Sequence, residues 1–319
     1  MQQLTLEQRY QIQVLRQQGL SCDQLARTLS VHRSTVFREV KRNKSEEGYQ
    51  ASKAESLRKG RYKGQKMKIV GKVASRIRRL LKEDQWSPEQ IAGHGKLTSR
   101  KSISHEAIYQ FIYRDTEAGG QLYKNLRHKN KKRQKRSGIY NTRGQIKDRV
   151  PIEERPAVAC EKTEFGHLEG DTVIGKGHSG RIVTIVDKRS MMLGARIVEN
   201  GEAHTVSKAL IIMLKKWKIP PKSLTLDNGK EFADHINITH KTQVPIYFCH
   251  PYASYERGLN ENHNGLLRQY FPKNQSFESI TQSELDQAVK KLNDRPRKSL
   301  GFLSPIQYFS KTKKQERKT

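Results

Sequence analysis

Three acidic residues, far apart in the chain, have the residue types and sequence contexts of metal ligands. Asp171 lies inside a β-forming segment, where aspartate is disfavoured. Asp227 ends a second such segment, and Glu261 follows it after 33 intervening residues, in a polar helical segment. Singly, Asp227 is typical of a turn and Glu261 of a solvated helix face. Together they supply the hard oxygen ligands that Mg²⁺ prefers.

A carboxylate set of this kind suits phosphodiester chemistry. Two divalent cations roughly 3.5–4 Å apart would activate the attacking oxygen and stabilise the leaving oxygen. Three carboxylates held together without cations would repel one another, and their pKa values would rise. Glu169 and Glu231 are weaker candidates for a further ligand. His263 is not expected to be one, because two residues along a helix turn its side chain away from the face of Glu261.

The segment 151–310 has the pattern of an α/β domain with a mixed sheet. Consecutive strands are expected over 166–174, 181–187 and 192–198. A helix is expected over 202–217, and two short strands over 222–226 and 244–248, each followed by a helical segment. The charged tail 311–319 is expected to be disordered.

Residues 1–43 are expected to form a helix-turn-helix domain. Two capping boxes, at Thr5 and Ser21, open the first two helices, and a tight turn leads into the third. The third helix should carry Val36, Phe37 and Val40 inside and basic residues outside, as in DNA-binding helices of this type. A small helical bundle that binds protein is the alternative.

The rest of the N-terminal half divides into a second helical unit and two basic segments. Residues 44–72 have little hydrophobic periodicity and are expected to be a basic, partly helical linker. Residues 73–123 are expected to form the helical unit, either a further helix-turn-helix or a bundle that only positions its neighbours. Residues 124–150 hold 11 basic side chains and one acid, and we expect this linker to follow a phosphate backbone.

The overall charge points to a polyanionic partner. The chain of 319 residues carries 62 Lys and Arg against 32 Asp and Glu, and 35 of these basic residues lie in the first 150 positions. Such a surplus favours nucleic acid, because neutralising phosphates releases counterions. No apolar run is long enough to span a membrane, and three cysteines are too few for a disulfide framework. We therefore expect a cytoplasmic, nucleoid-associated protein with no membrane partner.

Four sequence blocks resemble the DDE transposases of the insertion-sequence-thirty family, in the retroviral-integrase and ribonuclease-H-like superfamily. The similarity spans nearly the whole chain and is carried by His167–Asp171 with Gly175, Thr225–Phe232, Asn260–Lys273 and Leu292–Gly301; Ser34–Val36 and Arg38–Asn43 match as well.

The resemblance implies a multidomain protein, with N-terminal all-α helix-turn-helix units followed by a ribonuclease-H-like catalytic domain. It implies that Asp171, Asp227 and Glu261 are catalytic and bind two Mg²⁺ ions, for which Mn²⁺ could substitute. The implied reaction is cleavage at terminal inverted repeats, followed by strand transfer from the freed 3′-hydroxyl by direct transesterification. Joining two ends of double-stranded DNA implies a homodimer or a larger assembly.

Candidate DNA contacts lie in two regions, with ordinary surface charge as the alternative for those near the carboxylates. Two other functions stay open: a DNA-binding regulator with an inactive catalytic domain, and a structure-specific nuclease that does not join strands. The candidate contacts are Arg33, Ser34, Thr35, Arg38, Lys41 and Arg42 in the N-terminal domain, and Lys230, Arg257, Arg268 and Lys273 near the carboxylates.

Overall fold

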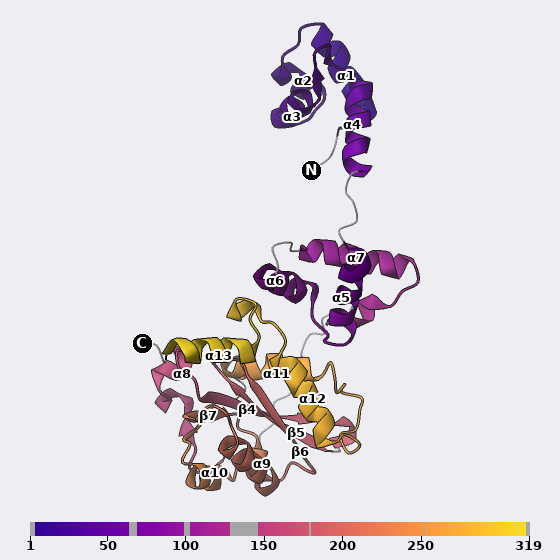
Figure 1. The fold of residues 1–319 in the computed structure, drawn as a ribbon. Helices are drawn as coiled ribbons and strands as arrows, with labels where there is room; N and C mark the ends of the chain where they lie inside the picture. The colour runs from indigo at the N-terminus through magenta and orange to yellow at the C-terminus, as the bar shows by residue number, and fades with distance from the viewer. Residues whose placement is uncertain are drawn as a thin grey trace. The chain divides into compact units, whose positions relative to one another are not determined.

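The computed structural model describes six stretches of the chain and divides it into two units (Figure 1). The described residues are 4–63, 69–98, 103–127, 146–178, 180–251 and 253–316. The first unit ends at Val70 and the second begins at Gly71. Each unit is described by itself below.

The first unit begins with the three helices that the sequence predicts: α1 (Leu6–Gln17), α2 (Cys22–Thr28) and α3 (Arg33–Asn43). Both predicted capping boxes are present, with Thr5 and Ser21 each accepting from the backbone three residues on. The three helices bury Ile12, Leu25 and Val36 against one another. Phe37 was predicted to be inside, but its side chain is 52% exposed.

The prediction of a linker over 44–72 is wrong for residues 44–63. A short hairpin, β1 (Lys44–Ser45) and β2 (Gly48–Tyr49), leads into helix α4 (Ala51–Lys63), which packs against α1. Ala51 and Ala54 are fully buried there. Small residues make this contact, so the segment lacks the bulky hydrophobic period that normally marks a packed helix. Residues 64–68 of the predicted linker lie outside the described residues.

The second unit opens with the predicted helical segment. Its helices α5 (Gly71–Lys82), α6 (Pro88–Thr98) and α7 (His105–Glu117) are followed by the 3₁₀ turn η1 (Leu122–Asn125). Most of the predicted basic linker 124–150 lies outside the described residues. Its last part is not a linker, because Ile146 is buried in the core of the sheet domain that follows.

The sheet domain confirms the predicted mixed α/β fold. A six-stranded sheet has the order β3-β8-β7-β4-β5-β6, in which β4, β5 and β6 are antiparallel and β7 and β8 run parallel to β4. The edge strand β3 was not predicted, because two residues carry no periodic signal. The strands are β3 (Val150–Pro151), β4 (His167–Ile174), β5 (Arg181–Asp187), β6 (Leu193–Val198), β7 (Ser223–Leu226) and β8 (Ile246–Phe248).

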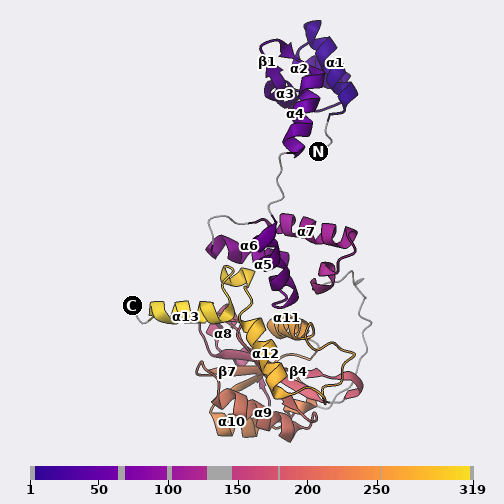
Figure 2. The same ribbon diagram turned by 45° about the vertical axis from the view of Figure 1, so that its right-hand side comes forward.

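Helices cover both faces of this sheet (Figures 1 and 2). On one face, α9 (Ala203–Lys215) and α10 (His235–Thr242) bury Leu210 and Ile238 against the strands. On the other, α11 (Gly258–Leu267) and α12 (Gln282–Asn293) bury Leu266 and Leu285. Both layers are built from apolar side chains at helical spacing, which fixes the helices that flank the carboxylates.

Two further helices complete the domain: α8 (Ala157–Glu161) and α13 (Pro305–Glu316). Phe309 of α13 packs edge-on against Phe165, with ring centroids 5.2 Å apart. The prediction of a disordered tail from residue 311 is therefore wrong up to Glu316, because the anchored helix continues to that residue; residues 317–319 lie outside the described residues.

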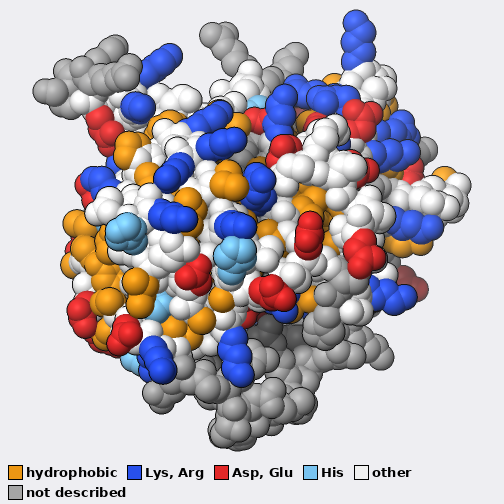
Figure 3. All heavy atoms as spheres, turned by 90° about the horizontal axis from the view of Figure 1, so that it is seen from below, with side chains coloured by type: hydrophobic (Ala, Val, Ile, Leu, Met, Phe, Trp, Pro, Cys, Tyr) orange, Lys and Arg blue, Asp and Glu red, His pale blue; other side chains and the backbone are white. Residues whose placement is uncertain are grey.

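The surface of the second unit mixes charges of both signs where it is visible in Figure 3, with Lys and Arg side chains interspersed among Asp, Glu and apolar groups. Beyond position 150 the chain carries 27 basic and 19 acidic residues, against 35 and 13 before it. In the described part of the chain, every helix is too short or too polar to span a lipid bilayer.

Candidate active site

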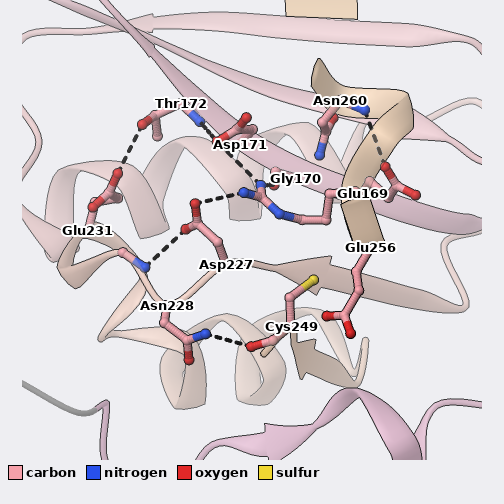
Figure 4. Close-up of polar contacts among 12 residues, drawn as sticks. Glu169, Gly170, Asp171, Thr172, Asp227, Asn228, Glu231, Cys249, Glu256 and Asn260 are labelled. Atoms are coloured by element: carbon pink, nitrogen blue, oxygen red, sulfur yellow. Dashed lines mark hydrogen bonds and ion pairs between the residues drawn. The ribbon is translucent and has the colours of Figure 1, made fainter. Parts of the chain in front are cut away.

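The register of the sheet brings Asp171 and Asp227 together. Strands β4 and β7 are parallel neighbours in which Glu169 pairs with Thr225. Continuing that register by two residues puts Asp227, just past the end of β7, level with Asp171. Side chains two residues apart lie on the same face of a sheet, so both carboxylates face the side covered by α11 (Figure 4).

A single guanidinium group joins the two carboxylates. Arg257, directly before α11, donates from Nη2 to Asp227 Oδ2 at 2.7 Å and lies with Nη1 3.3 Å from Asp171 Oδ1. The same Nη1 donates to the carbonyl oxygen of Gly170 at 2.9 Å. Arg257 is only 9% exposed. The two acids therefore share one buried positive charge.

Gly170, between Glu169 and Asp171, packs under apolar side chains of β7. A Cβ atom there would lie 2.6 Å from Leu226 Cδ2, the end of a flexible side chain, so a larger residue would require the Leu226 side chain to shift.

Burial and charge act in opposite directions on Asp171. Burial raises the pKa of its carboxyl above the ordinary value, and the nearby Asp227 charge adds to the rise, whereas the Arg257 charge opposes it. For Arg257, burial lowers the pKa of the guanidinium, but the two carboxylates outweigh burial, so its pKa is raised. Positive charge is thus strongly favoured between the two acids.

One face of α11 follows strand β4. Asn264 donates from Nδ2 to Asp171 Oδ2 at 2.7 Å, and Arg268 donates to the carbonyl oxygen of Ile174 at the end of the strand. Glu261 precedes Asn264 by three residues and Arg268 by seven, and this spacing puts all three on one side of a helix. Glu261 thus belongs to the helix face that turns towards β4, and its side chain is exposed to solvent.

The predicted convergence of three carboxylates is seen for two of them. Among the described residues, no group of three or more His, Cys, Asp or Glu side chains is arranged to hold a metal ion. In this structure the guanidinium of Arg257 provides the positive charge between Asp171 and Asp227.

The weaker acidic candidates have partners of their own. Glu169 forms a buried ion pair with Lys188 and accepts from the backbone N–H of Asn260. Glu231 accepts from the hydroxyl of Thr172 and lies 3.4 Å from a guanidinium nitrogen of Arg181.

The side chain of His263, on helix α11, is buried, and its ring nitrogens face the carbonyl oxygens of Leu259 and Met191. Burial lowers the pKa of this imidazole to about 4. That His263 is not a metal ligand stays a prediction.

Two of the predicted DNA contacts near the carboxylates have other roles. Arg257 was expected to hold the DNA backbone but is buried between Asp171 and Asp227. Arg268 binds a backbone carbonyl, with its guanidinium carbon 5.3 Å from the centre of the Phe277 ring. Neither arginine is free surface charge in this structure. Lys230 and Lys273 are exposed, as a phosphate contact requires.

The predicted contacts in the N-terminal domain lie on helix α3. Arg33, Arg38, Lys41 and Arg42 are exposed, and Ser34 and Thr35 are partly exposed. Arg33 pairs with the exposed Asp23, and the Ser34 hydroxyl hydrogen-bonds the ring of His32, which caps the helix. Phe37 stands among these basic side chains, with the Lys41 ammonium 5.8 Å from the centre of its ring.

Comparison with known proteins gives full-length relatives. The chain is 41% identical to the transposase for insertion sequence element IS4351 of Bacteroides fragilis, over 96% of this chain and 95% of that protein. It is 36% identical to transposase InsI for insertion sequence element IS30C of Escherichia coli K12, over 95% of this chain and 82% of the relative. The chain belongs to the IS30 family of transposases. Residues 1–43 of this transposase-family chain also match a helix-turn-helix domain.

The catalytic half of this IS30-family member was compared with solved structures as well. Its sheet is mixed, with antiparallel strands β4, β5 and β6 and parallel strands β7 and β8. A solved structure, the catalytic core domain of BIV integrase, aligns with 48% of this chain and 98% of that one at 16% identity and a TM-score of 0.38.

Asn264 was not predicted from the sequence as part of this site, and Arg257 was predicted to contact DNA rather than the two carboxylates. Both contact Asp171, and a spacing signal for them exists: Arg257, Glu261, Asn264 and Arg268 recur at intervals of four, three and four residues, the period of one helix face.

Proposed function

We propose that this IS30-family chain binds the terminal inverted repeats of an insertion sequence, cleaves a strand at the element end and transfers the freed 3′-end to target DNA. The observation that carries the proposal is the pair Asp171 and Asp227, placed on one sheet face and directed at a single positive charge. Membership of a transposase family gives this pair its chemical context.

The donor set fits divalent metal ions. Carboxylate oxygens are the ligands that Mg²⁺ prefers, and a few of them suffice because Mg²⁺ keeps several waters. The pair already holds a cationic group, so positive charge at this point is favoured. Asp171, Asp227 and Glu261 would hold two Mg²⁺ ions, with Mn²⁺ as a substitute. When bound, such ions activate the attacking oxygen and stabilise the leaving one.

The protein's own groups position the carboxylates for this role. Asn264 and the backbone N–H of Thr172 each donate to one oxygen of Asp171, and the backbone N–H of Gly229 donates to Asp227 Oδ1. These donors hold the carboxylates in fixed orientations. Glu261 lies on the face of α11 that also carries Asn264, three residues further on.

Two displacements at phosphorus make up the reaction. In the first, a water oxygen attacks the phosphorus at the element end and the P–O bond to the 3′-oxygen breaks; the water loses one proton to solvent and the released 3′-oxygen takes one up to become a hydroxyl. In the second, this 3′-hydroxyl attacks a phosphodiester of the target and the bond to the target's own 3′-oxygen breaks; the attacking hydroxyl loses its proton to solvent and the released target 3′-oxygen takes one up. No covalent bond to the protein forms in either step.

The exposed basic face of α3 is proposed to contact the element ends. Arg38, Lys41 and Arg42 are exposed along this helix, and a helix of a helix-turn-helix domain enters the major groove. Arg33, Ser34 and Thr35 at its start are proposed to face base edges, and Lys230 and Lys273 to hold the DNA backbone near the carboxylates. Because two ends must be joined, we propose that at least two protomers act together.

The test uses full-length protein, Mg²⁺ and labelled DNA that carries an element end. Asp171→Asn, Asp227→Asn and Glu261→Gln should each abolish cleavage and leave binding to the DNA close to that of the wild type. Asp286→Asn is a matched control, because Asp286 is an exposed acid of α12 away from the site.

The outcomes separate the alternatives. Cleavage by Asp227→Asn equal to that of the wild type would contradict the assignment. Binding without cleavage by the wild type would favour a regulator, and cleavage without joined products would favour a nuclease.

A further inference from the structure

Arg257 has an unusual position for a residue beside proposed metal ligands. It is 9% exposed, and its two terminal nitrogens are committed to Asp171, Asp227 and the carbonyl oxygen of Gly170. Its Nε is buried and makes no hydrogen bond within the described structure. The side chain is therefore held by the two carboxylates and by one backbone oxygen.

The positive charge of Arg257 offsets the electrostatic cost of holding the carboxylates of Asp171 and Asp227 close together. Asp171 is largely buried and lies beside Asp227, and both effects disfavour its ionised form. A guanidinium in the direct vicinity compensates two such charges, whereas removal of one partner from a buried ionic cluster leaves an uncompensated charge.

A metal ion bound by the carboxylate oxygens of Asp171 and Asp227 would lie very close to the guanidinium of Arg257. Mg²⁺ lies about 2.0–2.1 Å from its oxygen ligands, and Arg257 Nη2 is 2.7 Å from Asp227 Oδ2. Two cations on one carboxylate oxygen would repel each other strongly at such separations. The guanidinium and a divalent ion therefore compete for this place.

Arg257 lies at a junction between two elements, next to a partner that is partly exposed. It closes the 3₁₀ turn η5 (Ser254–Arg257) and directly precedes the first residue of α11. Asp227, its main partner, keeps 38% of its side chain exposed on the open side of the site.

We propose that Arg257 is an internal counter-cation, which neutralises Asp171 and Asp227 in the metal-free protein and is displaced when a divalent ion binds. This inference rests on the proposed function, because it takes the two aspartates as metal ligands. It assigns Arg257 a positioning and gating role: the metal-free site stays neutralised, and the affinity for metal is reduced by the energy needed to move the guanidinium out.

The experiment is a Mn²⁺ titration of the full-length protein, with free Mn²⁺ measured by electron paramagnetic resonance. Arg257→Gln should bind Mn²⁺ about tenfold more tightly than the wild type, since a competing positive charge is removed. Arg257→Lys should fall in between, because one ammonium cannot reproduce the planar fork of arginine that reaches both carboxylates. Lys241→Gln is the matched control, because it removes one exposed positive charge at the end of α10, and it should change the affinity little.

A second measurement covers the case in which Arg257→Gln is unstable. Without metal, Arg257→Gln should have a lower Tm than the wild type, and Mg²⁺ should raise its Tm by more than it raises that of the wild type. If Arg257→Gln does not fold even with Mg²⁺, the comparison of Arg257→Lys with the wild type decides the matter.

The proposal is overturned if Arg257→Gln, or Arg257→Lys where only that variant folds, binds Mn²⁺ no more tightly than the wild type. It is also overturned if Lys241→Gln tightens binding equally, since the loss of any positive charge would then explain the effect. Asp227→Asn distinguishes failure of this inference from failure of the proposed function. If this variant binds Mn²⁺ like the wild type, the proposed metal site is wrong, whatever the Arg257 variants show.

Discussion

At the scale of single residues, the orientation of Asp171 depends on its neighbours. Asn264 Nδ2 donates to Oδ2 at 2.7 Å and the backbone N–H of Thr172 donates to Oδ1 at 2.9 Å, so each oxygen has a donor in addition to the charge of Arg257. Thr184 Oγ1 lies 3.3 Å from both the carbonyl oxygen of Asp171 and Asn264 Oδ1, and so links the strand to the helix.

Asn264→Ala should therefore lower the rate of strand cleavage roughly 10- to 100-fold, the range seen when a partner that orients a metal ligand is removed. The measurement is single-turnover cleavage of end-labelled DNA at saturating protein. Asn200→Ala, an exposed asparagine in the loop before α9, should cleave like the wild type. Full activity of Asn264→Ala would mean that Asp171 needs no support from α11.

The proximity of Asp171 and Asp227 was easier to predict from the sequence than the contacts that the two side chains make. Asp171 and Asp227 stand out in the sequence because of where they fall in β-forming segments, and a parallel register brings them level. The position of Arg257 could not be predicted from residue type, because an arginine near acids is typical both of a phosphate contact and of an internal ion pair. Only the packing of α11 on β4 decides between them.

At the scale of elements, helix α4 extends the N-terminal domain beyond the three helices of its helix-turn-helix. Ala51 and Ala54 are fully buried, and Gln13 of α1 accepts from the backbone N–H of Ala51. The buried Arg9 of α1 donates to Glu39 of α3 and to Glu55 of α4, so one guanidinium joins three helices.

Ala54→Leu should destabilise this domain by about 1–3 kcal/mol, the usual cost of overpacking a filled core. Ser52→Leu, at an exposed position of the same helix, should change stability by no more than about 0.5 kcal/mol. Hydrogen exchange of the α1 and α3 amides in the full-length protein measures both effects. Equal exchange in the two variants would show that α4 is not part of the domain's core.

The strands and the long helices of the sheet domain were predictable because their hydrophobic periods are strong. Strand β5 has the same bounds as predicted, and β4, β6 and β7 differ by one residue. Helix α4 was missed as a packed element because it buries alanines rather than large apolar residues. The C-terminal part of α13 was missed because its residues are mostly charged, and Phe309, the apolar residue that packs the helix against the domain, comes before them.

At the scale of the whole molecule, positive charge is concentrated before the sheet domain. The net charge is +22 for residues 1–150 and +8 for the remainder, from 35 basic and 13 acidic against 27 basic and 19 acidic residues. We therefore expect residues 1–150 to contribute most of the sequence-independent affinity for DNA. The carboxylates lie in the remainder of the chain, where the numbers of positive and negative charges are closer to equal.

The double variant Lys41→Ala, Arg42→Ala should weaken DNA binding and reduce the slope of log K against log salt by about two, because each of the two side chains neutralises one phosphate. Lys215→Ala with Lys216→Ala removes the same charge from exposed positions at the end of α9 and should leave the slope nearly unchanged. Binding isotherms at several salt concentrations give both slopes. Equal slopes for the two double variants would remove helix α3 from the DNA interface.

The central claim is that Asp171, Asp227 and Glu261 together hold divalent ions for strand cleavage. It is tested most directly by anomalous diffraction from crystals of the full-length protein with Mn²⁺ and an uncleaved DNA end. The account predicts two Mn²⁺ peaks bound by these three side chains, with the Arg257 guanidinium moved off Asp227. Mn²⁺ bound elsewhere, with Arg257 still joining the two aspartates, would contradict it.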